Sequence, residues 1–395
     1  MRPLGRLAKL ERGKFSARPR NDPKYYGGKY PFIQTGDVRN SGGIVSSYTQ
    51  TLNDEGLQVS KLFPAGTLFL TIAANIGDLG VTEFASAAPD SLVAVQPSRD
   101  VDQSWLQYAL SSLKAVLEAT ASQNAQANLN LAKLNPFAML VPPHNEQVAI
   151  AASLSDIDAL TRALESIIGK KQAMMQGMTQ ALLTGTTRLP KFDGDWPRVA
   201  LGTHATGLRG VGLNKEALNP SGAHRCILYG ELFTTYGRRI SEVKSRTNVE
   251  TSVRSQTGDV LIPGSTTTVA RDLATASAIH LQGILLGGDT NVIRPDKAID
   301  PDWLAYYITH RLGDRISEIA QGTTIKHLYV RDLLNCTVRL PEIDEQHAII
   351  AALIDSQSEI SVLQQRLRKM KEIKRGMMQE LLTGRTRLAG SEVKT

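Results

Sequence analysis

A segment of 48 residues occurs twice in this chain of 395 residues, and it constrains the fold more than any other feature. The first copy runs from Pro142 to Leu189 and the second from Pro341 to Leu388, without a gap, at an offset of 199. Twenty of the 48 positions are identical. The shared start is P-x-x-x-E-Q-x-A-I-x-A-x-L and the shared end is G-M-x-Q-x-L-L-T-G-x-T-R-L. A period of about half the chain indicates one duplicated module.

Both copies have the hydrophobic spacing of a long helix. Apolar residues recur at steps of three and four, which places a narrow apolar seam along one side of a helix and is typical of a coiled coil. The predicted seam of the first copy comprises Ile150, Leu154, Ile157, Leu160, Leu164, Ile167, Met174, Met178 and Leu182. That of the second copy comprises Leu353, Ile360, Leu363, Leu367, Met370, Met377 and Leu381.

Helix length indicates what these seams pack against. A helix of about 40 residues rises about 60 Å, which exceeds the diameter of an ordinary domain. We therefore predict that the two helices pair as an antiparallel coiled coil; the alternative is that each packs on its own globular domain. Pro341 and Asp344 before the second helix, and Gly185 and Gly384 after the two helices, are residues typical of helix ends.

Composition is that of a soluble protein with a substantial core. The length predicts two or three domains, and the hydrophobic fraction of 42% is ordinary for globular proteins. No apolar run is long enough to span a bilayer, and the first residues lack the apolar core of a signal peptide. Cys226 and Cys336 are far apart and without CxxC spacing, which argues against a disulfide framework or a cysteine metal site. We expect a cytoplasmic protein.

Positive charge is concentrated in three clusters that together suggest a polyanionic partner. Residues 1–30 hold nine Lys and Arg against two acids, which equals the whole formal net charge of +7. The second cluster is Arg238, Arg239, Lys244, Arg246 and Arg254. The third, on the last helix, is Arg366, Arg368, Lys369, Lys371, Lys374 and Arg375. A solvated charged face is the alternative for each cluster, most of all for the helix.

The region before the first long helix has the pattern of a mixed α/β domain. Strands are predicted at Tyr30–Val38, Leu62–Ile72 and Ser91–Pro97, because these apolar runs are bounded by turn residues. A helix is predicted over Gln103–Ala119, with Asp102 before it as a plausible N-cap. A loop rich in amide side chains follows.

The region after a predicted linker, Lys191–Gly202, aligns with the first domain element by element. Trp303, Leu304 and Tyr306 stand over Trp105, Leu106 and Tyr108 at an offset of 198. The other matching segments are Cys226–Phe233, Thr257–Gly264, Thr290–Ile308 and Gly322–Glu342. Turn and core residues match, whereas the cationic and polar residues between them do not. The two domains therefore look like one scaffold with two different surfaces.

The predicted fold class is α+β. Two similar mixed α/β domains are joined by two long helices that form an antiparallel coiled coil, and the whole is an internal repeat with a pseudo-twofold axis. The predicted parts are a first domain at residues 1–141, a first long helix at 142–189, a second domain at 190–340, a second long helix at 341–388 and a tail at 389–395.

The doubled signature, together with the G-D/E turn and the W-L-x-Y helix before each copy, resembles the specificity subunit of type I restriction-modification systems. The resemblance covers nearly the whole chain. It implies two target-recognition domains that each read one half of a split DNA sequence, and two helices that set the unread gap. One departure is the start: Trp196 opens the second domain, but no tryptophan follows Met1, so we expect a short segment of the family pattern to be missing there.

The same resemblance implies the partners and cofactors. The subunit has no catalysis of its own and no cofactor. It binds double-stranded DNA and carries two modification subunits, which bind S-adenosylmethionine and methylate N6 of adenine. The complex can recruit restriction subunits that use ATP and Mg²⁺. No membrane partner is expected.

Candidate DNA contacts follow from side-chain chemistry. Lys and Arg contact phosphates, whereas Asn and Gln can pair with the edge of adenine. The phosphate candidates are Lys14, Arg18, Arg20 and Lys24 in the first domain and Arg238, Arg239, Lys244 and Arg246 in the second. The candidate base readers are Gln123, Asn124, Gln126 and Asn128, with Lys326 and His327 at the equivalent place in the second domain. Ordinary surface or loop-capping roles are the alternative for each residue.

Candidate docking residues lie in the shared ends of the two helices, which are more alike than a coiled-coil seam requires. Two near-identical ends suit two identical partner subunits. These candidates are Glu146, Gln147, Thr184, Arg188, Glu345, Gln346, Thr383 and Arg387.

Catalytic motifs are missing. The chain has no Asn-Pro-Pro-Tyr, no G-x-x-x-x-G-K-[ST] phosphate loop and no histidine spacing typical of a metal site. The leading hypothesis is therefore a non-catalytic subunit that reads DNA sequence for a methyltransferase complex. The alternatives are a basic protein-interaction scaffold that does not read DNA sequence and a self-sufficient nuclease.

Overall fold

The structure is a computed structural model that describes residues 1–121, 129–250 and 253–388. Its contacts divide the chain into two compact units: unit 1 comprises residues 1–165 and 365–395, and unit 2 comprises residues 166–364. The two long helices are α7, His144–Thr184, and α12, Ile343–Leu382. Each unit therefore contains one globule together with the neighbouring segments of both helices, rather than ending at residues 141 and 340.

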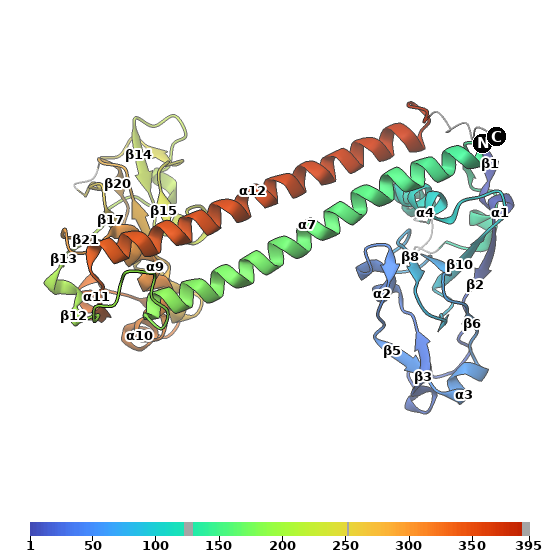
Figure 1. Cartoon of the computed structure of the whole chain (residues 1–395), viewed down its shortest axis with the longest axis horizontal. Coiled ribbons are helices and arrows are strands. Elements are labelled where there is room, and N and C mark those ends of the chain that lie inside the picture. The colour runs from blue at the N-terminus through green and yellow to red at the C-terminus, as the bar shows by residue number, and fades with distance from the viewer. Residues whose placement is uncertain (122–128, 251–252, 389–395) are drawn as a thin grey trace. The chain divides into compact units, whose positions relative to one another are not determined.

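Unit 1 is built on a five-stranded sheet in the order β2-β10-β7-β8-β4. A four-stranded sheet, β5-β3-β9-β6, and the pair β1·β11 complete it (Figure 1). Its strands are β1 Arg2–Pro3, β2 Ala8–Arg12, β3 Tyr26–Phe32, β4 Ile44–Val45, β5 Gln50–Leu52, β6 Leu62–Phe63, β7 Leu68–Thr71, β8 Leu79–Thr82, β9 Ser86–Ala87, β10 Leu92–Pro97 and β11 Ala138–Met139. Its short helices are α1 Leu4–Leu7, α2 Thr35–Asn40, α3 Asp54–Gln58, α4 Gln103–Ser112, α5 Lys114–Ala121 and α6 Leu131–Leu134.

Unit 2 repeats this plan with the sheet β13-β21-β17-β19-β15. The pair β12·β23 corresponds to β1·β11, and the three-stranded sheet β16-β14-β20 corresponds to β5-β3-β9 in order and pairing direction. The pair β18·β22 is added. Its strands are β12 Arg198–Ala200, β13 Ala205–Arg209, β14 His224–Ile227, β15 Arg239–Ile240, β16 Arg246–Thr247, β17 Asp259–Pro263, β18 Ser265–Thr266, β19 Ser277–Ile279, β20 Leu285–Leu286, β21 Thr290–Pro295, β22 Lys326–His327 and β23 Thr337–Arg339. Its short helices are α8 Glu231–Thr234, α9 Pro301–Arg311, α10 Gly313–Ile319 and α11 Val330–Leu334.

The equivalent strands agree in pairing and burial. The second strands of the two sheets, β10 and β21, are antiparallel to both neighbours, with Val95 opposite Leu10 and Val292 opposite Leu208. Each begins with four buried residues, as expected for a strand covered on both faces. The last strand of each sheet, β4 or β15, joins in parallel. The fold is thus the predicted pair of mixed α/β repeats with long helices.

The helices that follow β10 and β21, α4 and α9, are positioned in the same way in both units. Asp102 accepts a hydrogen bond from the Trp105 backbone N–H at 2.8 Å, and Asp300 accepts one from Trp303 at 2.8 Å. The predicted N-cap at Asp102 is therefore confirmed. Trp105 and Trp303 are at most 1% exposed, and each anchors the core of its unit.

Three local predictions were wrong. The second half of the predicted strand Tyr30–Val38 is helix α2, because the Asp37 carboxylate accepts a hydrogen bond from the Gln34 backbone N–H at 2.8 Å and starts a helical turn. The predicted helix 103–119 is broken at Leu113 into α4 and α5. The predicted linker 191–202 contains strand β12, which pairs with β23.

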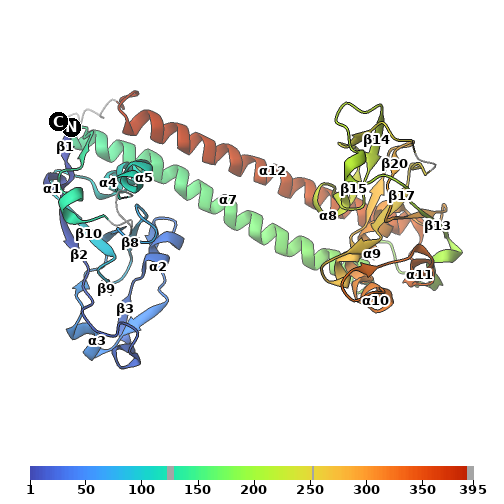
Figure 2. The ribbon, with the colours of Figure 1, turned by 180° about the vertical axis from the view of Figure 1, so that it is seen from behind.

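The long helices run antiparallel within each unit (Figures 1 and 2). In unit 1, Lys374 pairs with Asp158 at 2.6 Å and Lys371 with Glu165 at 2.7 Å. In unit 2, Lys171 pairs with Glu359 at 2.7 Å. The predicted seam of α12 is buried or half-buried along its length.

The seam predicted for α7 was wrong at three positions. Leu160, Ile167 and Met174 are 54%, 44% and 68% exposed. Ile168 is 7% exposed, and the seam runs through Leu154, Ile157, Thr161, Leu164, Ile168, Lys171, Met175, Met178 and Leu182. This register matches that of α12 at the offset of 199. The observed seam keeps steps of three and four residues because it includes the polar residues Thr161 and Lys171. The prediction followed apolar residues alone and therefore left this register.

Both long helices end as predicted. Gly185 and Gly384 have φ angles of 72° and 71°, in the left-handed region that glycine adopts without strain. The backbone N–H groups of Thr187 and Thr386 then bond back to Ala181 at 3.4 Å and to Glu380 at 3.2 Å, which satisfies carbonyls left open at the helix ends.

Candidate nucleic-acid interface

The basic N-terminal segment of unit 1 is folded onto the four-stranded sheet. A small separate core holds it there, with Phe15, Phe32 and Leu52 at most 4% exposed and three tyrosines packed around them. The predicted phosphate contacts Lys14, Arg18, Arg20 and Lys24 all belong to this segment and are exposed. In Figure 1, β3, β5 and α3 lie at the end of unit 1 away from its helix segments.

These four cations differ in how far their charge is already balanced. Arg20 donates two hydrogen bonds to Asp90, at 2.8 and 2.6 Å, and Lys24 lies 3.5 Å from Asp22. Arg18 donates to the backbone carbonyl of Ala17 at 2.7 Å. Among described residues, no carboxylate lies within ion-pair distance of Lys14 or Arg18. Their charges are therefore the most available to a polyanion.

The predicted base readers of unit 1 lie outside the described residues. These are Gln123, Asn124, Gln126 and Asn128.

One turn of unit 1, at residues 72–75, was not predicted as a candidate site from the sequence, and it lies next to Leu129. The backbone N–H of Leu129 donates to Ile72 at 2.9 Å, and the turn begins there. Ala74 has a φ of 62°, an uncommon conformation for a residue with a side chain. Arg39 donates to Asn75 in this turn at 2.9 Å. Strained turns are frequent at functional sites, so Arg39 and Asn75 join the candidates. Sequence periodicity gives no signal for a positive φ at alanine.

The predicted cations of unit 2 are not gathered on one surface. Arg246 lies on β16 and donates to the Gly222 carbonyl at 2.6 Å, and Lys244 is exposed beside it. Arg239 begins strand β15 of the five-stranded sheet, Arg238 directly precedes it, and both line a pocket described below. The four cations are neighbours in the sequence, but they lie at two separate places in unit 2.

Lys326 and His327 form strand β22, which pairs with Ser265 and Thr266 of β18. The Lys326 ammonium donates to the Gly322 carbonyl at 2.6 Å, and both residues are half-buried. The backbone of this strand is therefore fixed by its partner strand, and part of each side chain stays accessible.

The candidate docking residues at the helix starts are buried inside the chain. Glu146 and Glu345 are 4% and 2% exposed. Arg387 donates two hydrogen bonds to Glu146, at 2.7 and 2.6 Å. Arg188 does the same to Glu345, at 2.6 and 2.7 Å, and the Trp196 indole N–H adds a third at 2.9 Å. We call these two contacts the end clamps, because each joins the start of one long helix to the segment after the end of the other.

Electrostatics of the end clamps follow from these contacts. The hydrogen bonds from Arg387 hold the pKa of Glu146 below its ordinary value. The hydrogen bonds to Glu345 raise the pKa of Arg188, and those to Glu146 raise the pKa of Arg387. Glu146 and both arginines are therefore charged at neutral pH.

The next residue of each signature joins its helix to the globule. Gln147 is 1% exposed, accepts a hydrogen bond from the Asp102 backbone N–H at 2.8 Å and donates to the Pro142 carbonyl at 3.0 Å. Gln346 is 0% exposed, accepts from Asp300 at 2.8 Å and donates to Pro341 at 2.9 Å. The shared E-Q pair thus has an internal function in both units.

The docking role of the shared ends stays a prediction, but four of its eight residues, Glu146, Gln147, Glu345 and Gln346, are buried inside the chain. Buried side chains whose hydrogen bonds are satisfied within the chain have little left to offer a partner. Thr184 and Thr383 also donate to their own helices, at 2.9 Å to Gln180 and 2.5 Å to Gln379. The exposed apolar side chains of α7, Leu160, Ile167 and Met174, are spaced by seven and are accessible.

Two other kinds of site were sought in the part of the chain that the structure describes. It holds no group of three His, Cys, Asp or Glu residues that could bind a metal ion. None of its helices is long and apolar enough to cross a membrane.

Comparison with known proteins fits this architecture. The family model described as type I restriction modification DNA specificity domain matches residues 1–173 and 234–372. The chain belongs to this family. A chain of Methanocaldococcus jannaschii assigned as the specificity subunit of type I restriction enzyme MjaX is 22% identical over 392 residues, which covers 91% of this chain and 88% of the relative.

Solved structures of specificity subunits share the fold. The S subunit from M. genitalium superimposes with a TM-score of 0.58 at 15% identity, covering 96% of this chain and 95% of that one. The HsdS subunit from Thermoanaerobacter tengcongensis gives a TM-score of 0.53 at 17% identity, covering 97% and 96%. As a member of this family, the chain is a DNA specificity subunit, which recognises sequence and is not itself a catalyst.

Proposed function

We propose that each globule reads one half of a bipartite DNA target and that α7 and α12 set the unread gap between the halves. One observation carries this proposal: both units have the same sheet, the same capped helix and the same end clamp, but their cations lie on different elements. A repeated framework with unlike surfaces suits two unlike half-sites. Phosphate contacts then fix the register, and contacts to base edges read the sequence.

The partners belong to the same proposal. Two modification subunits bind S-adenosylmethionine and methylate N6 of an adenine in each half-site, and restriction subunits that use ATP and Mg²⁺ join when present. The end clamps hold the helix ends in place, and the docking surface is the outer face of the helices. Leu160, Ile167 and Met174 are its apolar residues on α7, since they are exposed and share one side of the helix.

Methylome sequencing of the source cell tests this function. The proposal predicts one split methylated motif that disappears when the gene for this chain is deleted. An unchanged methylome would exclude it.

The gap is tested separately by helix length. One heptad is inserted into both helices, after Glu165 and after Gln364, so that the paired seams stay in register. Seven residues add about 10 Å of rise, or about three base pairs of DNA. We expect the unread gap to lengthen while both half-sites stay the same. A change in the half-site sequences would show that the helices do not act as a spacer.

A further inference from the structure

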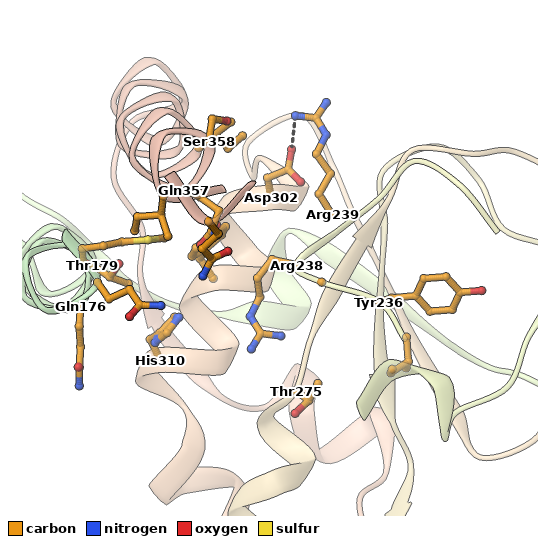
Figure 3. Close-up of a pocket in the computed structure, with 18 of the residues that line it drawn as sticks. Gln176, Thr179, Tyr236, Arg238, Arg239, Thr275, Asp302, His310, Gln357 and Ser358 are labelled. Carbon is orange, nitrogen blue, oxygen red and sulfur yellow. Dashed lines mark hydrogen bonds and ion pairs between the residues drawn. The ribbon is translucent and has the colours of Figure 1, made fainter. Parts of the chain in front are cut away.

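A pocket of about 770 Å³ lies in unit 2 between the globule and the helix segments. Its polar walls come from α7 (Gln176, Thr179), α9 (Asp302, His310) and α12 (Gln357, Ser358). Figure 3 shows Gln176, His310 and Gln357 on the side of the Arg238 guanidinium, and Asp302 and Ser358 on the side of Arg239. Pockets of about 300–1,000 Å³ are the size of small-molecule sites.

Two neighbouring arginines enter this pocket with different partners. Arg239 lies 3.6 Å from Asp302, a buried carboxylate that also contacts His280 at 3.0 Å. The Arg238 side chain points the other way (Figure 3), and among described residues its guanidinium donates one hydrogen bond, to the Ala276 carbonyl at 3.2 Å. A guanidinium has five N–H donors. Among described residues, Arg238 has no carboxylate partner, so a half-buried positive charge is left with unused donors facing the pocket.

His310 supplies a second donor. Its ring stacks on Tyr306, with 6.0 Å between the ring centroids, and it lines the same pocket. The surrounding protein and the nearby Arg238 charge lower the pKa of His310 below its ordinary value. An anion between the two side chains would balance Arg238 and favour the protonated imidazole.

Unit 1 has a pocket of about 600 Å³ at the equivalent place, but the charges in it are balanced differently. There, Lys374 pairs with Asp158 at 2.6 Å, and Tyr108 donates to the same carboxylate at 2.7 Å. At the offset of 199, Met175 and Gln357 replace Lys374 and Asp158 in unit 2. Unit 2 thus lacks the internal ion pair and has an unbalanced arginine instead.

We propose that this pocket binds a small phosphate-bearing molecule whose phosphate group is bound by Arg238 and His310. Arginine matches the geometry of a phosphate through paired N–H groups, and the amides of Gln176 and Gln357 add donors from two helices. The pocket is walled by α7, α9 and α12, and Lys244 and Arg246 are not among its lining residues. A bound ligand would therefore join the globule of unit 2 to its helix segments.

Calorimetry on the full chain tests the site with three probes: adenosine monophosphate, inorganic phosphate and adenosine. Adenosine monophosphate should bind, adenosine should not, and inorganic phosphate should compete. Tighter binding of adenosine monophosphate than of phosphate would identify a phosphate monoester as the ligand, whereas equal affinities would identify free phosphate. Arg238→Gln should weaken binding at least tenfold and His310→Asn at least threefold. The matched control is Arg315→Gln on α10, an exposed arginine paired with Glu318, which should bind as the parent does.

The contrary results are equally specific. Adenosine binding as tightly as adenosine monophosphate, or Arg238→Gln and His310→Asn both binding as the parent does, would overturn the proposal. If Arg238→Gln unfolds at a lower temperature than the parent, His310→Asn decides alone. If no probe binds but Arg238→Gln reduces the salt dependence of duplex DNA binding by about one phosphate contact, Arg238 belongs to the DNA interface and the proposal is wrong.

Discussion

The two end clamps contain the same pair of glutamate and arginine, but they differ in how well this pair is shielded from water. In unit 2, the carboxylate of Glu345 accepts hydrogen bonds from Arg188 and from Trp196. In unit 1, Glu146 is bound by Arg387, whose side chain is 64% exposed, and the described residues provide no tryptophan there. Arg188 is 25% exposed and lies 5.4 Å from the Trp196 ring centroid. The clamp of unit 2 is therefore better shielded from water.

This difference separates framework from surface. The carboxylate and the arginine occur in both units, because the antiparallel helices need them at both ends. What surrounds them differs, as does the pocket between each globule and its helix segments: in unit 1 an ion pair lines it, and in unit 2 an arginine without a carboxylate partner among described residues lines it. Residues that recur in both units thus hold the architecture, and residues that occur in one unit are where a specific role should be sought.

The largest expected effect is on the framework. Trp303→Ala and Trp105→Ala remove side chains that are 0% and 1% exposed. Each should lower the free energy of unfolding by about 3–5 kcal/mol, because the cavity left by an aromatic ring does not close. Urea unfolding followed by circular dichroism measures both. Nearly equal losses support an equivalent framework, and a loss below about 1 kcal/mol in one unit would break the equivalence.

The clamps should respond unequally. Glu345→Ala leaves Arg188 and the Trp196 N–H without their acceptor, and it should lower the free energy of unfolding by about 2–3 kcal/mol. Glu146→Ala should cost less, because water can solvate the freed Arg387. Thermal unfolding of the two variants side by side gives the comparison. A greater loss for Glu146→Ala would contradict the proposed shielding.

A third pair of variants compares the seam with the outer face of α7. Leu164→Ala removes a half-buried seam residue and should lower the free energy of unfolding by about 1–2 kcal/mol. Leu160→Ala removes an exposed side chain and should change it by at most about 0.5 kcal/mol. Leu160→Ala should instead weaken binding of the modification subunit, measured by size-exclusion chromatography of the mixed subunits. If Leu160→Ala destabilises more than Leu164→Ala, the seam register is wrong.

The smallest expected effect is a pH dependence in unit 1. The folded pKa of Glu146 is lowered, so this group stabilises the fold above its ordinary pKa near 4.5, and the contribution is lost as the pH falls through the lower, folded value. Between pH 7 and pH 3, the unfolding temperature of Glu146→Gln should therefore fall less steeply than that of the parent. Arg387→Gln should give a similarly shallow slope. Parallel slopes for all three proteins would show that the clamp is not a source of acid sensitivity.

Local chemistry explains why much of the fold could be predicted. Asp102 stands at the distance from Trp105 that an N-cap requires, and Gly185 and Gly384 end the helices, because caps and left-handed turns depend on a few neighbouring residues. The seam of α7 was predicted at wrong positions, although the alignment of the two copies of the repeat indicates the right ones. Leu160 and Ile167 align with the charged Glu359 and Arg366. The observed seam positions Thr161 and Ile168 align with Ile360 and Leu367, which were already in the predicted seam of α12.

Long-range partners could not be predicted in the same way. Periodicity shows that Glu146 and Glu345 recur, but not that arginines more than 150 residues away, Arg387 and Arg188, bind them inside the chain. The separation of Arg238 from Arg246 also depends on tertiary packing, because two strands of different sheets carry neighbouring parts of one basic segment. Charge clusters in sequence therefore predict a polyanion partner better than they predict which cation contacts it.

The central claim, that each globule reads its own half-site, is tested most directly by duplicating one globule. Residues 1–141 are replaced with a second copy of residues 190–340, both long helices are kept, and the methylome of a host that carries the modified system is sequenced. The account predicts a methylated motif in which the half-site of the second globule occurs twice, with the gap unchanged. If the parent motif persists, or if the half-site of the removed globule is still read, the assignment of one half-site to each globule is wrong.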